Sequence, residues 1–271
     1  MSYLSTKAII TQKILLYLQF PVVIHIGSAQ ILLHAVLEIA AYFIAFRYFL
    51  WLRKKQGDAI PQSNRLWIII AAIFGSLFGS RIVGGFEDPA QIQKAQNVWL
   101  YFYSNKTVLG GFVGGLFGVE LVKKIIGEQQ ASGDLFTYPM LLGLIIGRIG
   151  CFSMGVYEET YGTETTLFTA MNLGDGLLRH PVTLYEIGWL IMTGVLIVWL
   201  RKKYPLENGA SFKVFMIGYC LFRFMCEFIK PHYVLPIGIS TIQLVALLCL
   251  LWYYRYIIQP QKLLKITVPE T

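Results

Sequence analysis

The sequence predicts an all-α, polytopic integral membrane protein with about seven transmembrane helices, on two observations. Of the 271 residues, 56% are hydrophobic and only 14% are charged, whereas soluble domains are about 25% charged. The apolar residues also gather in repeated runs close to the roughly 20 residues that a helix needs to cross a bilayer. We interpret residues 1–271 as a single membrane domain.

Seven apolar runs are expected to form the spans. They cover residues 31–52, 66–85, 108–123, 135–153, 182–200, 212–229 and 237–257. The third run is short and rich in glycine, so its ends are the least well defined. Ahead of these runs, Lys13 and Pro21 interrupt residues 8–27, which predicts an interfacial helix rather than a span. This segment lacks the features of a removable signal peptide.

The charged residues predict the orientation of the chain. Basic clusters such as 53–55 and 201–203 follow the odd-numbered spans, and acidic residues gather in the alternate loops. By the positive-inside rule, the N-terminus lies outside and the C-terminus is cytoplasmic. The long loops 86–107 and 154–181 are then outer loops. The net charge of +8 reflects this distribution, and we expect no nucleic-acid partner.

The four cysteines, Cys151, Cys220, Cys226 and Cys249, lie in or at the ends of predicted spans. They have neither metal-ligand spacing nor a disulfide pattern. We therefore expect buried thiols that behave as small apolar groups. A nucleophilic role for Cys151 is disfavoured because no partner base is visible in the sequence.

Ionisable residues within the spans mark a candidate site, since each costs at least about 2.5 kcal/mol in the bilayer centre unless it is paired or hydrated. Arg223 and Glu227 are four residues apart and therefore lie on one helical face. They form either a structural salt bridge or part of a functional site. Arg81 and Arg148 have no acidic residue within a turn and lie toward the predicted outer ends of their helices. Converging guanidinium groups there suit a phosphate, and a phospholipid headgroup is the phosphate most available.

A second feature is the glycine-rich segment "VLGGFVGGLFG", residues 108–118. Small residues four apart let transmembrane backbones approach closely. Gly110, Gly111, Gly114 and Gly115 therefore predict a helix-packing motif, and 75–79 and 143–147 repeat the spacing. By itself, this motif predicts only that the second, third and fourth helices pack tightly.

Several ordered blocks together resemble the prolipoprotein diacylglyceryl transferase family. They are "IHIGSAQI" (24–31), "GSRIVGGF" (79–86), "LGGFVGG" (109–115), "GRIGCFSMG" (147–155), "RHPVTLYE" (179–186) and "FRFMCEF" (222–228). The resemblance implies a seven-span fold in the bacterial cytoplasmic (inner) membrane. It also implies transfer of the diacylglyceryl part of phosphatidylglycerol to a cysteine thiol of a lipoprotein precursor, with release of glycerol phosphate.

The same resemblance implies roles for individual residues. Arg148 and Arg223 would bind phosphate, with Glu227 orienting Arg223. His180, Tyr185 and Glu186 would lie where the outer loop meets the fifth helix. The implied partners are membrane phospholipid and the signal peptide of a lipoprotein precursor, and the resemblance implies neither a metal nor a cofactor.

The chain departs from the family pattern where chemistry would occur. The histidine before the paired glycines is Leu109, and leucine cannot accept a proton. Cys151 and Met154 stand where asparagine is usual, Val156 where glutamate is usual, and His34 where tyrosine is usual.

These departures predict a displaced base. His34 stands four residues before Glu38, so that a carboxylate can orient its imidazole. A purely structural pair of these two residues is the alternative. His180 is a second candidate base, although its position before proline favours a role in fixing the loop.

Three functions are therefore open. The first is the family transferase with a modified site. The second is a lipid-modifying enzyme of the same fold with another acceptor or donor. The third is a non-catalytic phospholipid-binding relative.

Overall fold

The computed structural model describes residues 19–265. Within them, a helix stands at each of the seven predicted places. These helices are α2 (Leu33–Gln56), α3 (Gln62–Gly85), α6 (Val108–Ile126), α7 (Asp134–Met154), α8 (Val182–Lys203), α9 (Ala210–Cys226) and α10 (Thr241–Trp252). By length and composition, α2, α3, α7 and α8 are able to cross a membrane, and α10 is a shorter apolar helix. These helices support a multi-pass membrane protein.

The segments between these helices carry short elements of their own. The predicted loop 86–107 contains α4 (Pro89–Lys94) and α5 (Val98–Ser104), which begin at side-chain caps from Asp88 and Asn97. The loop 154–181 contains η1 (Gly155–Tyr157) and the paired strands β3 (Met171–Asn172) and β4 (Leu178–Arg179). Three further elements are η2 (Glu227–Ile229), α11 (Tyr254–Ile258) and η3 (Pro260–Leu263).

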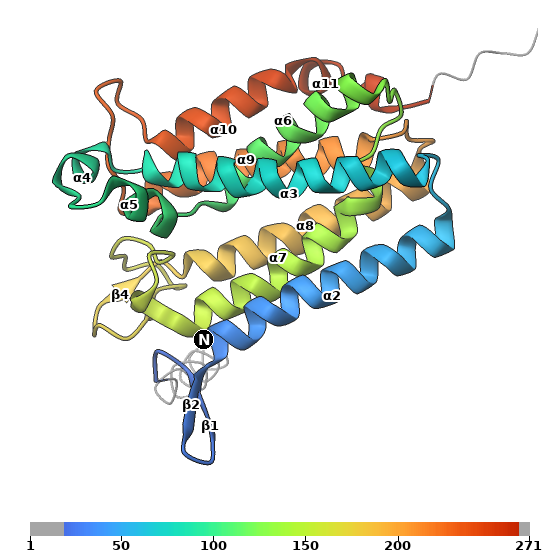
Figure 1. Ribbon diagram of the computed structural model, residues 1–271. Helices are drawn as coiled ribbons and strands as arrows, with labels where there is room; N and C mark the ends of the chain where they lie inside the picture. The colour runs from blue at the N-terminus through green and yellow to red at the C-terminus, as the bar shows by residue number, and fades with distance from the viewer. Residues whose placement is uncertain (1–18, 266–271) are drawn as a thin grey trace, which may run out of the picture. The chain divides into compact units, whose positions relative to one another are not determined.

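The interfacial helix predicted for 8–27 is wrong for residues 19–27, while residues 8–18 lie outside the described part. An antiparallel hairpin of β1 (Val23–Ile26) and β2 (Ala29–Leu32) leads into α2 (Figure 1). Ile26 faces Ala29 across a two-residue turn. Its first residue, Gly27, has φ +61°, a value that such hairpin turns require and that glycine adopts freely. For the same reason α2 begins at Leu33 rather than at residue 31.

The described chain divides into two compact units, and the boundaries fall inside α2, α7, α8 and η2 and after Pro231. Unit 1 contains residues 19–48, 139–192 and 229–231, and unit 2 contains the remainder. Within unit 1, α7 lies close against α2 through glycines. A Cβ on Gly143 would lie 3.1 Å from the Cβ of Ala45, and one on Gly150 would lie 3.3 Å from His34 Nδ1. The short approach at Gly150 positions His34 beside the last turns of α7.

Within unit 2, α3 and α6 cross at glycine residues. A Cβ on Gly114 would overlap the carbonyl oxygen of Gly75 and lie 2.7 Å from the Cα of Gly79. A Cβ on Gly110 would meet the Gly79 carbonyl oxygen at 2.5 Å, and one on Gly115 would meet Ser76 Oγ at 2.5 Å. The two backbones therefore touch directly at this crossing, as small residues allow in membrane helices.

Close backbone contact is absent at Gly111 of the predicted packing motif and at Gly147 of the repeated spacing at 143–147. A Cβ on Gly111 would find only ordinary contacts, with Ser76 O and Ser80 Cβ both at 3.7 Å. A Cβ on Gly147 of α7 would meet nothing within 4 Å. The four-residue spacing thus identifies the α3–α6 crossing, but close contact is needed at only some of its glycines.

The turn between α2 and α3 is organised by a buried carboxylate. Asp58 accepts hydrogen bonds from Arg53 Nε at 2.9 Å and from Arg65 Nε at 2.7 Å, with a further one from Arg65 Nη2. The backbone N–H of Ile60 donates to the same carboxylate at 3.1 Å. Arg65 also donates to the carbonyl oxygen of Ser132 at 3.2 Å, which ties this turn to the start of α7 within unit 2.

This arrangement predicts an acid-sensitive contribution to stability. Burial alone would raise the pKa of Asp58, but the hydrogen bonds from Arg65 and Ile60 and the nearby positive charges hold it below 3.8. A lowered folded-state pKa stabilises the fold above the unfolded value, and this stabilisation is lost as the pH falls through the lowered pKa. We expect Asp58→Asn to remove this acid-dependent component and to lower the free energy of unfolding at neutral pH by about 1.5–3 kcal/mol.

Unfolding of the detergent-solubilised chain as a function of pH measures both effects. The matched control is Asp175→Asn, because Asp175 forms a surface ion pair with Arg179 and such pairs contribute about 1 kcal/mol or less. An Asp58→Asn profile that coincides with the wild type at every pH would contradict the role of this carboxylate.

Candidate active site

Arg148 and Glu186 form a buried ion pair between α7 and α8. Arg148 Nε lies 2.9 Å from Glu186 Oε1, and the two side chains are 9% and 2% exposed. The sequence shows no acidic residue within a turn of Arg148, and the structure supplies a more distant one. Its partner comes from another helix, 38 positions along the chain, where helical spacing gives no indication of contact. The guanidinium is held in a fixed orientation at the end of α7.

His34 is the centre of a second cluster in unit 1. Its Nε2 lies 3.6 Å from Glu38 Oε2, one turn further along α2, and its Nδ1 lies 3.5 Å from Glu158 Oε2. Cys151 Sγ lies 3.5 Å from Glu158 Oε1 and 3.6 Å from Arg148 Nη1. An imidazole, a thiol and a carboxylate are thus within reach of one another beside a fixed guanidinium.

A turn after α7 returns Glu158 to this cluster. Gly155 has φ +60°, and a Cβ there would overlap the carbonyl oxygen of Leu173. The next backbone N–H, that of Val156, donates to the same oxygen at 3.0 Å. Only glycine fits both the conformation and the close approach. The chain therefore reverses here, and Glu158 comes back to face α2 and α7.

His180 is integrated into the loop that precedes α8. Its backbone N–H donates to Thr163 O at 3.0 Å, and its carbonyl oxygen accepts from Gly162 N at 3.0 Å. The buried imidazole lies 3.3 Å from the hydroxyl of Tyr185 through Nδ1. The Tyr185 hydroxyl is in turn 2.5 Å from Thr169 Oγ1. These contacts fix the shape of the loop, which is the role that the histidine–proline sequence favours.

The remaining candidate residues lie in unit 2. Arg223 Nη2 is 3.6 Å from Glu227 Oε2, and both side chains are buried. The pair lies where α9 ends and η2 begins. Arg81 of α3 stacks over the ring of Tyr103 from α5, with 4.8 Å between the guanidinium carbon and the ring centroid. Leu109 is fully buried in α6, so its place in the fold is apolar.

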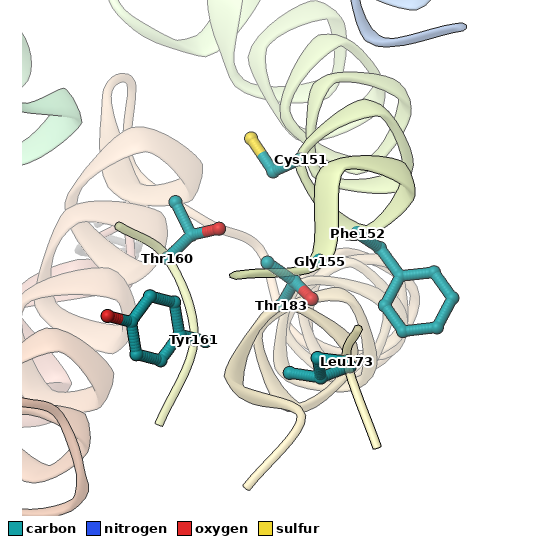
Figure 2. A pocket seen from close by; sticks show the side chains of 7 residues that line it. All are labelled: Cys151, Phe152, Gly155, Thr160, Tyr161, Leu173 and Thr183. Carbon is teal, nitrogen blue, oxygen red and sulfur yellow. The ribbon is translucent and has the colours of Figure 1, made fainter. Parts of the chain in front are cut away.

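A narrow pocket lies beside the end of α7. It is lined by Cys151, Phe152, Gly155, Thr160, Tyr161, Leu173 and Thr183. Figure 2 shows Cys151 at its edge, with Thr160 and Tyr161 on one side and Thr183 at the start of α8 on another. The space between these side chains is too small for an ordered water molecule. In this conformation the pocket does not admit a lipid chain.

Sequence reasoning identified His34, Glu38 and Arg148 but missed Glu158, which lies against both His34 and Cys151. Glu158 was grouped with the other acidic residues of the outer loop, because nothing in its local spacing distinguishes it. Cys151 was expected to be an inert buried thiol. Both belong to the His34 cluster through contacts between distant parts of the chain.

Comparison with known proteins agrees with the family resemblance of the sequence blocks. The family model described as prolipoprotein diacylglyceryl transferase matches residues 21–258. A phosphatidylglycerol–prolipoprotein diacylglyceryl transferase of Cupriavidus pinatubonensis is 30% identical, over 80% of this chain and 81% of the relative. The protein of the same name from Nitrosomonas europaea is 28% identical, over 89% of this chain and 92% of the relative. The chain therefore belongs to the prolipoprotein diacylglyceryl transferase family.

Proposed function

We propose that this chain transfers the diacylglyceryl group of phosphatidylglycerol to a cysteine thiol of a lipoprotein precursor. The transfer forms a bond between the thiol sulfur and a glycerol carbon and breaks the bond from that carbon to the phosphate oxygen. Glycerol phosphate leaves with the bonding electrons, and the thiol gives up its proton. The observation that carries the proposal is the fixed guanidinium of Arg148 next to an imidazole–thiol–carboxylate cluster, in a chain of this family.

The donor phosphate is the proposed ligand of Arg148. Phosphate binding by Arg223 and by Arg81 stays a separate prediction from the sequence. A planar guanidinium binds phosphate oxygens through paired N–H donors, and its other N–H groups are able to donate to a carboxylate at the same time. Glu186 and Glu227 then act as positioning residues, because each holds its arginine in one orientation. Tyr185 and His180 act by shaping the loop before α8.

The acceptor thiol needs a group that removes its proton, and Leu109 supplies none. The His34 cluster is the proposed replacement, with Glu38 orienting the imidazole. Histidine is suited to this role because its charge state changes near neutral pH.

Within the proposal, the seven helices form a single membrane domain of the bacterial cytoplasmic membrane, with the N-terminus outside and the C-terminus cytoplasmic. The cluster then faces the outer side, where the start of α2 and the end of α7 meet.

Mass spectrometry of an acceptor peptide tests this function. The purified chain in phosphatidylglycerol vesicles is incubated with a signal-type peptide that contains one cysteine, and separately with its Cys→Ser counterpart. We expect a diacylglyceryl mass increase on the cysteine peptide alone, and none in phosphatidylethanolamine vesicles. Retention of phosphatidylglycerol by the chain without any peptide modification would contradict the transferase and favour a phospholipid-binding relative.

A further inference from the structure

The His34 cluster has the composition of a metal site. His34, Cys151 and Glu158 each offer one ligand atom, and these atoms lie within 4.8 Å of one another. The three residues come from α2, the last turns of α7 and the segment after η1, so separate parts of the backbone of unit 1 fix their positions. Sulfur, imidazole nitrogen and carboxylate oxygen are the three donor types that Zn²⁺ uses in proteins.

Two separations within the cluster, one to each Glu158 oxygen, are close to those between ligand atoms of a tetrahedral ion. With metal–ligand distances of about 2.0–2.3 Å, neighbouring ligand atoms around tetrahedral Zn²⁺ are separated by about 3.3–3.8 Å. Cys151 Sγ and Glu158 Oε1 are 3.5 Å apart, and His34 Nδ1 and Glu158 Oε2 are also 3.5 Å apart. Neither His34 Nδ1 nor Glu158 Oε2, both buried, has a hydrogen-bond partner among the described residues. With the imidazole proton on Nε2, both atoms are acceptors, and a cation between them would stabilise the pair.

The surroundings of the cluster also suit a metal. A histidine that binds a metal through one nitrogen usually donates the other N–H to a carboxylate. Glu38 lies 3.6 Å from Nε2, opposite the nitrogen that faces Glu158. Arg148 Nη1 lies 3.6 Å from Cys151 Sγ, so the thiol is held beside a guanidinium that comes from the same helix. The side chains of His34 and Glu158 are 21% and 29% exposed, so the cluster is reachable from outside unit 1.

We propose that His34 Nδ1, Cys151 Sγ and the Glu158 carboxylate bind Zn²⁺ and leave a fourth position for the acceptor thiol of the proposed transfer. Three protein ligands and one open position are typical of catalytic zinc sites. A thiol that coordinates zinc loses its proton outright. The proton passes to water, and the zinc-held thiolate sulfur attacks the glycerol carbon while the phosphate oxygen leaves with its electron pair. This inference rests on the proposed function, but the zinc ion, and not the His34 imidazole acting as a base, makes the acceptor thiol lose its proton. It explains how the chain operates with leucine at position 109.

Metal content measured by elemental mass spectrometry tests the site without any turnover. The full chain is purified, supplied with zinc and dialysed. We expect about one zinc ion per chain. His34→Gln, Cys151→Ser and Glu158→Gln should each lose the ion. The matched controls His25→Gln, Cys226→Ser and Glu159→Gln should retain it, because these residues lie outside the cluster. Glu38→Gln should weaken zinc binding by about 10–100-fold. Zinc absent from the wild type, or retained in all the cluster variants, would overturn the site.

Cobalt substitution tests the thiol position separately. Co²⁺ in the wild-type site should show a thiolate-to-metal charge-transfer band that Cys151→Ser lacks. Adding the cysteine peptide should strengthen this band, and adding its Cys→Ser counterpart should leave it unchanged. An unchanged spectrum with the cysteine peptide would overturn the role of the metal in holding the acceptor.

Chelation separates this inference from the proposed function. Removing the metal should abolish transfer to the peptide, and returning zinc should restore it. Transfer that continues after complete removal of zinc would overturn the inference while leaving the proposed function intact. A chain that binds zinc and shows the cobalt response to the cysteine peptide, yet never modifies it, would uphold the metal site and contradict the proposed function.

Discussion

Arg148→Ala is expected to lower the free energy of unfolding by about 3–5 kcal/mol and to abolish diacylglyceryl transfer. The loss of stability follows because Glu186, with a side chain only 2% exposed, would keep a buried charge without its cation. The loss of transfer follows because the proposed phosphate ligand is removed. Unfolding of the detergent-solubilised chain and mass spectrometry of the acceptor peptide measure the two effects.

Two further variants separate the effect on the free energy of unfolding from the effect on diacylglyceryl transfer. Arg148→Ala combined with Glu186→Ala should recover part of the stability, because no uncompensated charge remains, but it should recover no transfer. Arg179→Ala is the matched control, since its surface pair with Asp175 is expected to contribute about 1 kcal/mol or less. If Arg148→Ala unfolded like the wild type and still modified the peptide, neither role of this arginine would stand.

Gly114→Leu is expected to disrupt the crossing of α3 and α6, at a cost of more than about 3 kcal/mol, the upper end of the usual effect of overpacking. Any Cβ at this position would overlap backbone atoms of Gly75 and Gly79. Backbone cannot move aside as a flexible side chain can, so the two helices would have to separate. The melting temperature of the solubilised chain and its resistance to proteolysis measure the effect.

Gly111→Ala provides the control in the same helix. The added methyl group would make only ordinary contacts at 3.7 Å, and alanine favours a helix over glycine by up to about 1 kcal/mol. We therefore expect this variant to be as stable as the wild type or slightly more stable. Equal melting of Gly114→Leu and Gly111→Ala would show that the helices do not touch at their glycines.

The helices are predictable from the sequence because their signal is local. Each apolar run is long and continuous, and each predicted run coincides with a helix in the described chain. The observed helix ends differ from the predicted bounds where residues at the end of the helix set its length. Gly127, with φ +71°, ends α6 beyond the apolar run. Basic residues 201–203 extend α8 past its apolar part. Side chains of this type interact favourably with the C-terminal end of a helix.

The β1–β2 hairpin was missed although a signal was present. Residues 24–31 alternate between apolar and polar side chains around a Gly–Ser pair, which is a hairpin pattern. The interpretation of 8–27 as one interfacial helix gave too much weight to overall apolar character. An apolar segment of this length does not by itself distinguish a helix from a strand.

The candidate site was predictable only where its contacts are local. His34 with Glu38 and Arg223 with Glu227 are both four residues apart, a spacing that brings side chains together on any helix. Arg148 with Glu186, and His34 with Cys151 and Glu158, join segments distant in the sequence. No periodic pattern encodes such pairs, because they depend on which helices pack together and on the reversal at Gly155.

The central claim is that this chain, with leucine at position 109, moves a diacylglyceryl group from phosphatidylglycerol to a thiol. Phosphatidylglycerol labelled with heavy isotopes, one on the glycerol that carries the acyl chains and another on the headgroup glycerol, tests it most directly. We predict that the wild-type chain places only the first label on the cysteine peptide and releases the second as glycerol phosphate in equal amount. An unlabelled peptide, or a peptide that carries both labels, would contradict the account.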